Sequence, residues 1–326
     1  MINKIHFGKR IAAHRHTLGI SQSELADRLG VTSQAVSKWE CGSALPDIEL
    51  LLALSKLYAV TVNDLLEPRD ILSELANRPF ETIGSIACFT SKEEPPHNIA
   101  WAKAIIDGDW IKRNWEQEMT ADDEIKSSVA SRILSHGGRI LEIGTGPGGG
   151  FMPAILKHDP DASVTISDLS PTVVRQWKHF LDRTLHSPNL SYAVFNFCDI
   201  PFRDESFDVV SDGGGIGNTE QGSRASALRE VCRILKPDGI LVTSTGFVTR
   251  ETLAALPESA QSVLKEKRPD IFEDLYEDTV LAGFSRIESL ICGGWDTDGD
   301  DSTIADLARS LGVNLHFTSY IRFCFK

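Results

Sequence analysis

The sequence predicts two folds in one chain, a small all-α domain followed by a larger α/β domain with a doubly wound, mostly parallel sheet. Three observations lead to this prediction. Residues 1–66 contain short helix patterns with capping residues, and from residue 137 strand-like and helix-like segments alternate. A glycine-rich turn, "LEIGTGPGGG" (141–150), follows the first of those strands. The length of 326 residues is enough for two or three domains.

The composition is that of an ordinary globular protein, with 41% hydrophobic and 24% charged residues. A net charge of −13 argues against a general affinity for nucleic acid or anionic membranes. Residues 1–66 are nearly neutral, so we expect any nucleic-acid contact there. The six cysteines include no C-x-x-C pair, and no apolar run reaches membrane-spanning length. The sequence therefore predicts no metal site, no disulfide framework, no membrane contact and a cytoplasmic protein.

The stretch "ISQSELADRLGVTSQAVSKWE" (20–40) contains the signals of two short helices. Ser21 and Glu24 form the pattern of a capping box at the start of the first helix. Gly30 suits the left-handed residue that ends this helix, and Thr32 can cap the next one. Two short helices joined by a turn that contains Gly are typical of a helix-turn-helix motif.

This stretch resembles the Cro/repressor-type (XRE-like) helix-turn-helix family over residues 5–66. The matching positions are Gln22, Leu25, Ala26, Leu29, Gly30, Val31, Thr32, Val36, Ser37, Trp39, Glu40, Gly42 and Pro46. The second helix of such motifs lies in the major groove. The resemblance implies a homodimer that binds a double-stranded DNA operator through Gln22, Ser33, Gln34, Ser37 and Lys38. Gln34 would pair with adenine and Gln22 with a phosphate. The alternative is a helical bundle used only for dimerisation or protein contact.

The middle of the chain changes character twice. Residues 67–98 contain four prolines and a "SKEEPP" run, which predict a linker. Residues 99–136 return to a helical pattern with several bulky apolar residues. We expect a helical cap that packs on the following domain. The alternative is a lid over a substrate pocket, with Trp110, Trp115 or Met119 in its wall.

Residues 137–326 alternate strands and helices. Strands are predicted over 139–143, 163–168, 190–195, 207–211, 239–245, 283–291 and 315–325. Helices are predicted between them over 151–158, 171–185 and 223–235. In such a sheet the ligand binds beyond the carboxyl ends of the strands.

Acidic residues stand at those strand ends. Glu142 precedes the glycines, Asp168 ends the second strand, and Asp199 follows the third. A carboxylate in the position of Asp168 can accept hydrogen bonds from ribose hydroxyls of NAD or of any adenosine ligand. The glycines fit both G-x-G-x-x-G and G-x-G-x-G, so their spacing does not decide between these ligands.

The remaining motifs distinguish NAD from another adenosine ligand. "CDIPF" (198–202), the strand that begins at Phe207 and "RILKPDGILVTST" (233–245) resemble the class I S-adenosylmethionine-dependent methyltransferases of the small-molecule, ubiquinone-biosynthesis-like type. The resemblance covers about residues 137–248. It implies a seven-stranded, Rossmann-like sheet with an antiparallel last strand, and S-adenosyl-L-methionine as cofactor. The implied cofactor-binding residues are Glu142, Gly144, Thr145, Gly146, Gly148, Asp168, Leu169, Cys198, Asp199, Ile200, Asp212 and Gly213.

The resemblance also distributes these residues over the cofactor. Glu142 and the glycine turn would hold the methionine part, Asp168 the ribose, and Asp199 the adenine amino group. The segment "SDGGG" (211–215) lacks the N-P-P-Y type of signature, which disfavours methylation of a nucleobase. We therefore expect a small-molecule methyl acceptor and regulation of transcription, and the sequence indicates no catalytic base. The alternative is a non-enzymatic repressor that senses S-adenosylmethionine or a metabolite.

Overall fold

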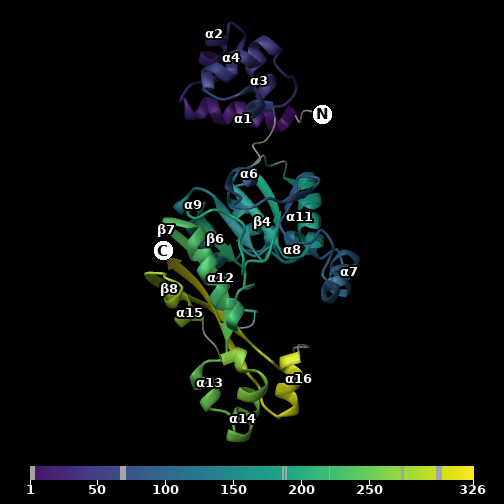
Figure 1. Ribbon diagram of the computed structural model, residues 1–326, viewed down its shortest axis with the longest axis vertical. Coiled ribbons are helices and arrows are strands. Elements are labelled where there is room, and N and C mark those ends of the chain that lie inside the picture. The colour runs from purple at the N-terminus through teal and green to yellow at the C-terminus, as the bar shows by residue number, and fades with distance from the viewer. Residues whose placement is uncertain are drawn as a thin grey trace. The chain divides into compact units, whose positions relative to one another are not determined.

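The computed structural model describes residues 4–66, 71–185, 187, 189–219, 221–272, 275–298 and 303–326 (Figure 1). The chain divides into two compact units, and the boundary falls close to residue 74. We describe each unit separately. None of the helices in the described ranges is both long and apolar enough to cross a bilayer.

The N-terminal unit begins with a small helical domain. Its helices are α1 (Lys4–Thr17), α2 (Gln22–Leu29), α3 (Ser33–Glu40), α4 (Ile48–Tyr58) and α5 (Val62–Leu66). The predicted caps are confirmed: Ser21 and Glu24 form the complete capping box, and Gly30 is left-handed with φ 67°. Fully buried side chains of Leu25, Val36 and Leu54 hold these helices around one apolar core. The predicted helix-turn-helix arrangement is therefore confirmed.

The second unit is built on a nine-stranded sheet. Its strands are β1 (Glu81–Ile83), β2 (Ile86–Cys88), β3 (Ile140–Ile143), β4 (Val164–Asp168), β5 (Leu190–Val194), β6 (Phe207–Asp212), β7 (Leu235–Phe247), β8 (Arg286–Asp296) and β9 (His316–Phe325). The order is β1-β2-β5-β4-β3-β6-β7-β9-β8. Strands β5, β4, β3, β6 and β7 run parallel, and β9 is antiparallel to both of its neighbours. The seven predicted strands and the antiparallel last strand are confirmed.

The two additional strands come from the segment that the sequence predicts as a linker. Helix α6 (Ile71–Leu75) is followed by the β1–β2 hairpin, and β2 pairs in parallel with β5, Ile86 opposite Tyr192. Each strand has three residues, too few for an alternating pattern to be recognised. Burial of Ile86, Ala87 and Cys88 against the sheet stabilises the hairpin instead.

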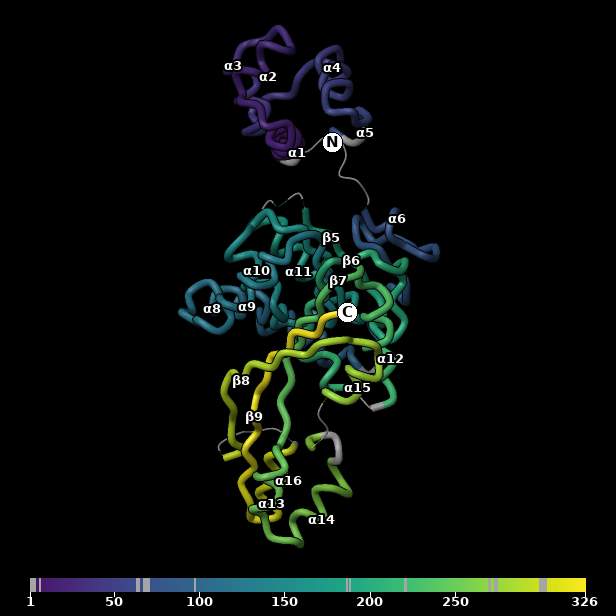
Figure 2. Tube along the Cα trace, turned by 90° about the vertical axis from the view of Figure 1, so that its left-hand side faces the viewer, coloured from purple at the N-terminus to yellow at the C-terminus, as the bar shows by residue number. Residues whose placement is uncertain are grey.

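Helices cover both faces of this sheet. They are α7 (Ile99–Asp107), preceded by the 3-10 turn η1 (Pro96–Asn98), α8 (Trp110–Thr120), α9 (Glu124–His136), α10 (Met152–His158), α11 (Pro171–Thr184), α12 (Gln221–Ile234) and α15 (Leu275–Leu281). Figure 2 shows α9, α10 and α11 on one side of the sheet and α12 and α15 on the other. The helical pattern of residues 99–136 is confirmed as α7, α8 and α9. Trp115 of α8 is buried, with its ring edge against Trp177, as expected of a packing residue.

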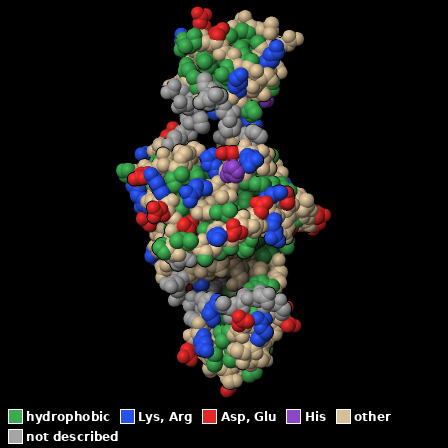
Figure 3. Space-filling model, turned by 90° about the vertical axis from the view of Figure 1, so that its right-hand side faces the viewer, with side chains coloured by type: hydrophobic (Ala, Val, Ile, Leu, Met, Phe, Trp, Pro, Cys, Tyr) green, Lys and Arg blue, Asp and Glu red, His purple; other side chains and the backbone are tan. Residues whose placement is uncertain are grey.

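Strands β7, β8 and β9 are longer than the other strands of the sheet and continue past them into a helical lobe. It contains α13 (Arg250–Ala254), α14 (Glu258–Lys267), η2 (Pro269–Phe272) and α16 (Thr303–Ser310). Val248, Leu264 and Leu315 belong to an apolar core of the lobe's own. Figure 3 shows the surface hollowed between this lobe and the body of the sheet.

Candidate functional site

The glycine-rich turn after β3 is held rigidly. The Thr145 amide and hydroxyl both donate to the Ser167 carbonyl of the next strand, at 3.0 and 2.8 Å. The Trp177 indole N–H donates to the Gly146 carbonyl at 2.7 Å. These bonds join the turn to β4 and α11. The turn is therefore preorganised at the carboxyl ends of two parallel strands, where a ligand is expected.

The glycines of this turn fall into two groups. A Cβ added at Gly148 would meet no atom within 4 Å, and one at Gly146 would meet only the Gly144 carbonyl at 3.9 Å. A Cβ at Gly149 would lie 2.6 Å from Pro153, and one at Gly150 1.8 Å from Glu142 Oε1. Gly146 and Gly148 therefore leave open space beside the turn that a ligand can fill. Gly149 and Gly150 are required for the turn to fold against the protein.

Glu142 is a fully buried carboxyl group beneath the turn. Its Oε2 accepts a hydrogen bond from Ser211 Oγ at 2.5 Å, whereas its Oε1 has no hydrogen-bond partner. Burial raises the pKa of Glu142 well above its usual value, and the nearby Asp212 carboxylate adds to the effect. An unsatisfied buried acceptor is costly, so Glu142 is suited to receive a cationic or N–H group of a ligand.

Asp212, at the end of β6, shapes the neighbouring turn. Its carboxylate accepts hydrogen bonds from the Gly215 amide and from Thr243 Oγ1, both at 2.7 Å. Burial raises the pKa of Asp212 to about 6. A Cβ at Gly213 would lie 2.5 Å from the Gly150 Cα, so the turns after β3 and β6 touch. Asp212 therefore positions a turn, and Gly213 permits the close approach of two backbones.

Asp168, at the end of β4, joins the turn to α11. Its Oδ2 accepts from the Gly146 amide and its Oδ1 from the Ser170 amide, both at 2.8 Å. A second carboxylate, Glu94, accepts from Ser170 Oγ at 2.8 Å, and its buried Oε1 has no partner. The pKa of Asp168 is raised, mainly by burial and also by the charge of Glu94. Two carboxylates thus stand where the ribose is expected. Leu169, beside them, is 38% exposed.

The loop after β5 is held by contacts within the protein. The side chain of Asp199 is 70% exposed and is paired with Arg78, whose Nη1 lies 2.8 Å from both carboxylate oxygens. The Ile200 amide donates to Glu230 Oε2 at 2.8 Å, and the Cys198 amide to its neighbour Asn196. The backbone amides that were expected to flank an adenine are therefore bonded within the protein, whereas each Asp199 oxygen keeps a second lone pair.

Phe197, in the same loop, lies directly over the glycine turn. Its ring is 3.4 Å from the position that a Cβ would take at Gly144 and at Gly215. The ring therefore bridges the turns after β3 and β6 next to the predicted cofactor residues. An aromatic face at this place is suited to pack against an apolar or aromatic part of a ligand.

In the N-terminal domain, helix α3 has one face buried in the core and one face exposed to solvent. Val36 and Trp39 are buried in the core. The predicted DNA-contacting residues of this helix, Ser33, Gln34, Ser37 and Lys38, are all exposed. The helix can therefore present all four side chains to another molecule without loss of core packing.

Several polar side chains of this domain make hydrogen bonds within it. Gln22 Nε2 donates to Glu40 Oε2 at 2.7 Å, and Glu40 is paired with the buried Arg15. Arg10 donates twice to the Leu65 carbonyl. Arg10 and Arg15 thus stabilise the domain. A phosphate contact by Gln22 would use the second hydrogen of its amide.

Comparison with known proteins finds one family match in each of the two parts of the chain. The helix-turn-helix family matches residues 11–65, and the methyltransferase domain family matches residues 141–243. The chain joins a helix-turn-helix domain to a methyltransferase domain. The SPbeta prophage-derived uncharacterized HTH-type transcriptional regulator YonR of Bacillus subtilis is 35% identical over 91 residues, which are 27% of this chain and 84% of YonR. Both family resemblances predicted from the sequence are confirmed.

A relative of the methyltransferase domain is the ubiquinone/menaquinone biosynthesis C-methyltransferase UbiE of Geotalea daltonii. It is 32% identical over 105 residues, 32% of this chain and 44% of UbiE, so the match spans less than half of that relative. Among solved structures, the MccD protein superposes with a TM-score of 0.46 at 17% identity, over 62% of this chain and 97% of MccD.

Several residues near the candidate site in the second unit have no signal in the sequence. Glu94 and Arg78 come from the segment that was expected to be a linker, and Phe197 directly precedes the predicted residue Cys198. Asn114 of α8 donates to the Pro147 carbonyl of the glycine turn at 2.9 Å. Each depends on contacts between distant parts of the sequence. The spacing of Phe197 from the end of β5 is the one local feature that could have indicated it.

Proposed function

We propose that the protein binds operator DNA through its helix-turn-helix domain and methylates a small molecule with S-adenosylmethionine in its methyltransferase domain. We further propose that it is a cytoplasmic homodimer that regulates transcription. The DNA-binding domain comprises residues 1–66 and the methyltransferase domain residues 137–326, to which the β1–β2 hairpin adds two strands.

The observation that carries the cofactor proposal is the division of the glycine turn. Gly146 and Gly148 face open space, and the buried Glu142, which lies against Gly150 of the same turn, keeps an unsatisfied oxygen. These features fit the amino-acid part of S-adenosylmethionine, whose ammonium group can donate to a carboxylate. Asp168 stands at the end of the next strand, where a carboxylate accepts from ribose hydroxyls. The residues present therefore fit this cofactor.

When bound, S-adenosylmethionine supplies an electrophilic methyl group on its sulfonium. The protein's part is to hold donor and acceptor in line, because much of the acceleration of such a transfer comes from positioning. The rigid turn with its bonds to Ser167 and Trp177 fixes the donor side. The hollow between the sheet and the α13–α16 lobe offers room for an acceptor. No residue is assigned as a general base.

The DNA-binding proposal depends on the outer face of α3. Gln34 is exposed at the start of that helix, where its amide can pair with an adenine edge. The domain is nearly neutral, and two of its arginines are used internally. Phosphate contacts supply much of the affinity of DNA-binding proteins. We therefore expect modest affinity per domain, which a dimer on two half-sites would increase.

The deciding experiment is calorimetric titration of the full chain with S-adenosylmethionine and with its demethylated product. Micromolar binding, about 8 kcal/mol, supports the site. Transfer of labelled methyl to a component of a metabolite extract would then establish an enzyme. Cofactor binding with no transfer to any extract would favour the sensing repressor. The Gln34→Ala variant serves as control, since it should bind the cofactor normally and lose DNA affinity.

A further inference from the structure

The segment Leu75–Arg78, here called the connector, begins nine residues after the helix-turn-helix domain's last helix ends at Leu66. It lies along the loop Cys198–Arg203, here called the post-β5 loop. The Arg203 amide donates to the Leu75 carbonyl at 2.9 Å, and the Asn77 amide to the Pro201 carbonyl at 3.1 Å. Between these bonds, Ala76 and Phe202 form an antiparallel bridge. The connector is thus paired with the post-β5 loop like a short strand.

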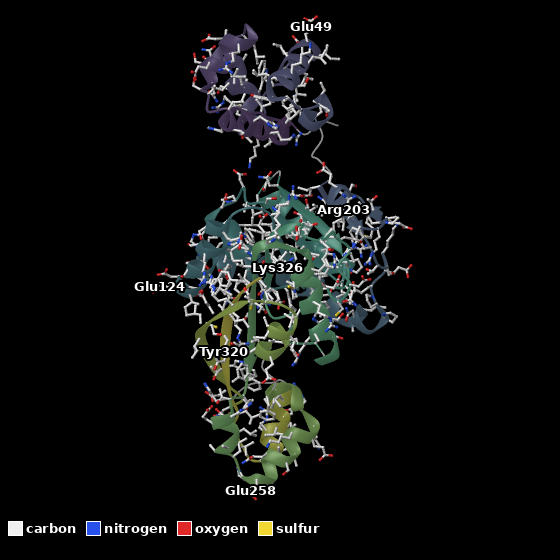
Figure 4. The ribbon with its side chains drawn as sticks, turned by 60° about the vertical axis from the view of Figure 1, so that its left-hand side comes forward. Glu49, Glu124, Arg203, Glu258, Tyr320 and Lys326 are labelled. Carbon is white, nitrogen blue, oxygen red and sulfur yellow. The ribbon has the colours of Figure 1, made fainter. Side chains whose placement is uncertain are left out.

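Side chains reinforce this pairing from both directions. Asn77 Nδ2 donates to the Phe202 carbonyl at 3.0 Å. Arg203, labelled in Figure 4, donates from Nε to the Ala76 carbonyl at 3.2 Å. The connector is therefore fixed by backbone and side-chain bonds together.

Arg78 is the last residue of the connector and forms an ion pair with Asp199 of the post-β5 loop. Its Nη1 lies 2.8 Å from both carboxylate oxygens, and its Nη2 donates to the Asp199 carbonyl at 3.0 Å. A planar guanidinium that engages the carboxylate and the backbone of the same residue fixes both at once. Each carboxylate oxygen keeps a second lone pair for another donor.

Helix α12 also fixes the post-β5 loop, through bonds to Ile200 and Phe202. The Ile200 amide donates to Glu230, and Arg233 donates to the carbonyls of Ile200 and Phe202 at 2.8 and 2.7 Å. The ring of Phe202 is fully buried. Bonds from α12 therefore hold the backbone on both sides of Asp199, and Arg78 of the connector holds the Asp199 side chain itself.

We propose that Arg78 is a positioning residue of the cofactor site, and that the connector makes cofactor binding and DNA binding depend on each other. The first half rests on the proposed function, in which the post-β5 loop flanks the adenine. Arg78 orients Asp199 so that its free lone pairs face the adenine amino group. Binding of the adenosine part then adds a second attachment to Asp199, which holds the connector more firmly on the loop.

Coupling to DNA follows from the short distance along the chain. A firmly docked connector limits the reach of a domain attached nine residues away, and a dimer must place two such domains on two half-sites. A ligand shifts such an equilibrium by its differential affinity for the two states. The dependence is reciprocal, so DNA must change the cofactor affinity by the same factor.

The first test measures binding of S-adenosylhomocysteine by calorimetry to the wild type, Arg78→Ala and Arg78→Lys. Arg78→Ala should weaken binding about fivefold, the most that an exposed ion pair of this kind supplies, and Arg78→Lys should recover part of it. Arg309→Ala is the matched control, because it removes another arginine–aspartate pair whose Asp306 is also 70% exposed. The melting temperatures of all variants should stay close to that of the wild type.

The second test measures DNA affinity by fluorescence anisotropy, with duplexes tiled over the region upstream of the protein's own gene. Saturating S-adenosylhomocysteine should change the wild-type affinity by up to about fivefold, and this change should be lost in Arg78→Ala but kept in Arg309→Ala. Equal cofactor affinity in the wild type and Arg78→Ala, with DNA affinity unaffected by cofactor, would overturn the inference and leave the cofactor site standing. No cofactor binding to the wild type would instead refute the proposed function, and the inference with it.

Discussion

Gly148 and Gly150 stand two residues apart in one turn, yet alanine should affect them in opposite ways. Gly150 has φ 58°, and its added Cβ would lie 1.8 Å from Glu142 Oε1. An L-residue in this left-handed conformation costs about 1–2 kcal/mol. Displacing the buried Glu142 breaks its bond to Ser211, which costs about 1.5–3 kcal/mol more. We therefore expect Gly150→Ala to lose roughly 2.5–5 kcal/mol of unfolding free energy.

Gly148 has neither problem, because its φ is not positive and an added Cβ meets no atom within 4 Å. Gly148→Ala should change the unfolding free energy by no more than about 0.5 kcal/mol. The methyl group would instead occupy the space through which the cofactor approaches. Overpacking of a fitted site costs about 1–3 kcal/mol, so the Kd for S-adenosylhomocysteine should rise roughly 5- to 150-fold.

Thermal melting and calorimetric titration of the two variants check this pair. At about 2–4 °C per kcal/mol for a domain of this size, Gly150→Ala should melt roughly 5–20 °C below the wild type. Gly148→Ala should melt with the wild type and bind poorly. The reasoning is refuted if Gly148→Ala is as unstable as Gly150→Ala, or if it is stable and binds the cofactor with wild-type affinity.

Three further predictions follow from single side chains. The pKa of Asp212 is about 6 in the fold against an ordinary 3.8, so the fold favours the protonated form. This contribution to the free energy of unfolding is complete below pH 3.8 and is lost as the pH rises through about 6, by about 3 kcal/mol in total. Urea denaturation between pH 4 and 7 should show this fall in unfolding free energy for the wild type, and an equal fall for Asp212→Asn would contradict the prediction. Glu94→Gln removes a negative charge beside Asp168 and should lower the pKa of Asp168. In a plot of cofactor affinity against pH, the loss of binding on the acidic side should then move to lower pH. Glu93→Gln, at the exposed neighbouring position, should leave that plot unchanged. Gln34→Ala should weaken operator binding by about 1–3 kcal/mol and relax the preference at one base pair, which anisotropy with single-base operator variants measures; a uniform loss on all sequences would indicate a phosphate contact instead.

The parts of this protein that could be predicted from sequence are those with local causes. Ser21, Glu24 and Gly30 act within one turn of helix, so their pattern gave the caps correctly. The seven strands from β3 to β9 could be predicted because each is an apolar or alternating segment between turn signals, and the helices between them predict parallel pairing. Glu142 and Asp168 stand at strand ends because the fold brings such ends to one edge.

What could not be predicted depends on distant pairings. Arg78 meets Asp199 across 121 residues, and Glu94 meets Ser170 across 76. Neither partner carries a local pattern. The prolines of residues 67–98 were interpreted as a linker because proline interrupts regular structure. The hairpin nevertheless forms, since its stability comes from burial on β5 rather than from its own sequence.

That hairpin has a consequence for how the protein is made. Its parallel partner β5 lies about 100 residues later in the chain, so at roughly 5–20 residues per second β2 leaves the ribosome several seconds before β5. The helices of residues 4–66 can be complete during this interval, since their contacts are local. During this interval the apolar strand β2 has its hairpin partner β1 but lacks β5 on its other edge. Nascent chains stalled between β2 and β5 should therefore be the most dependent on chaperones.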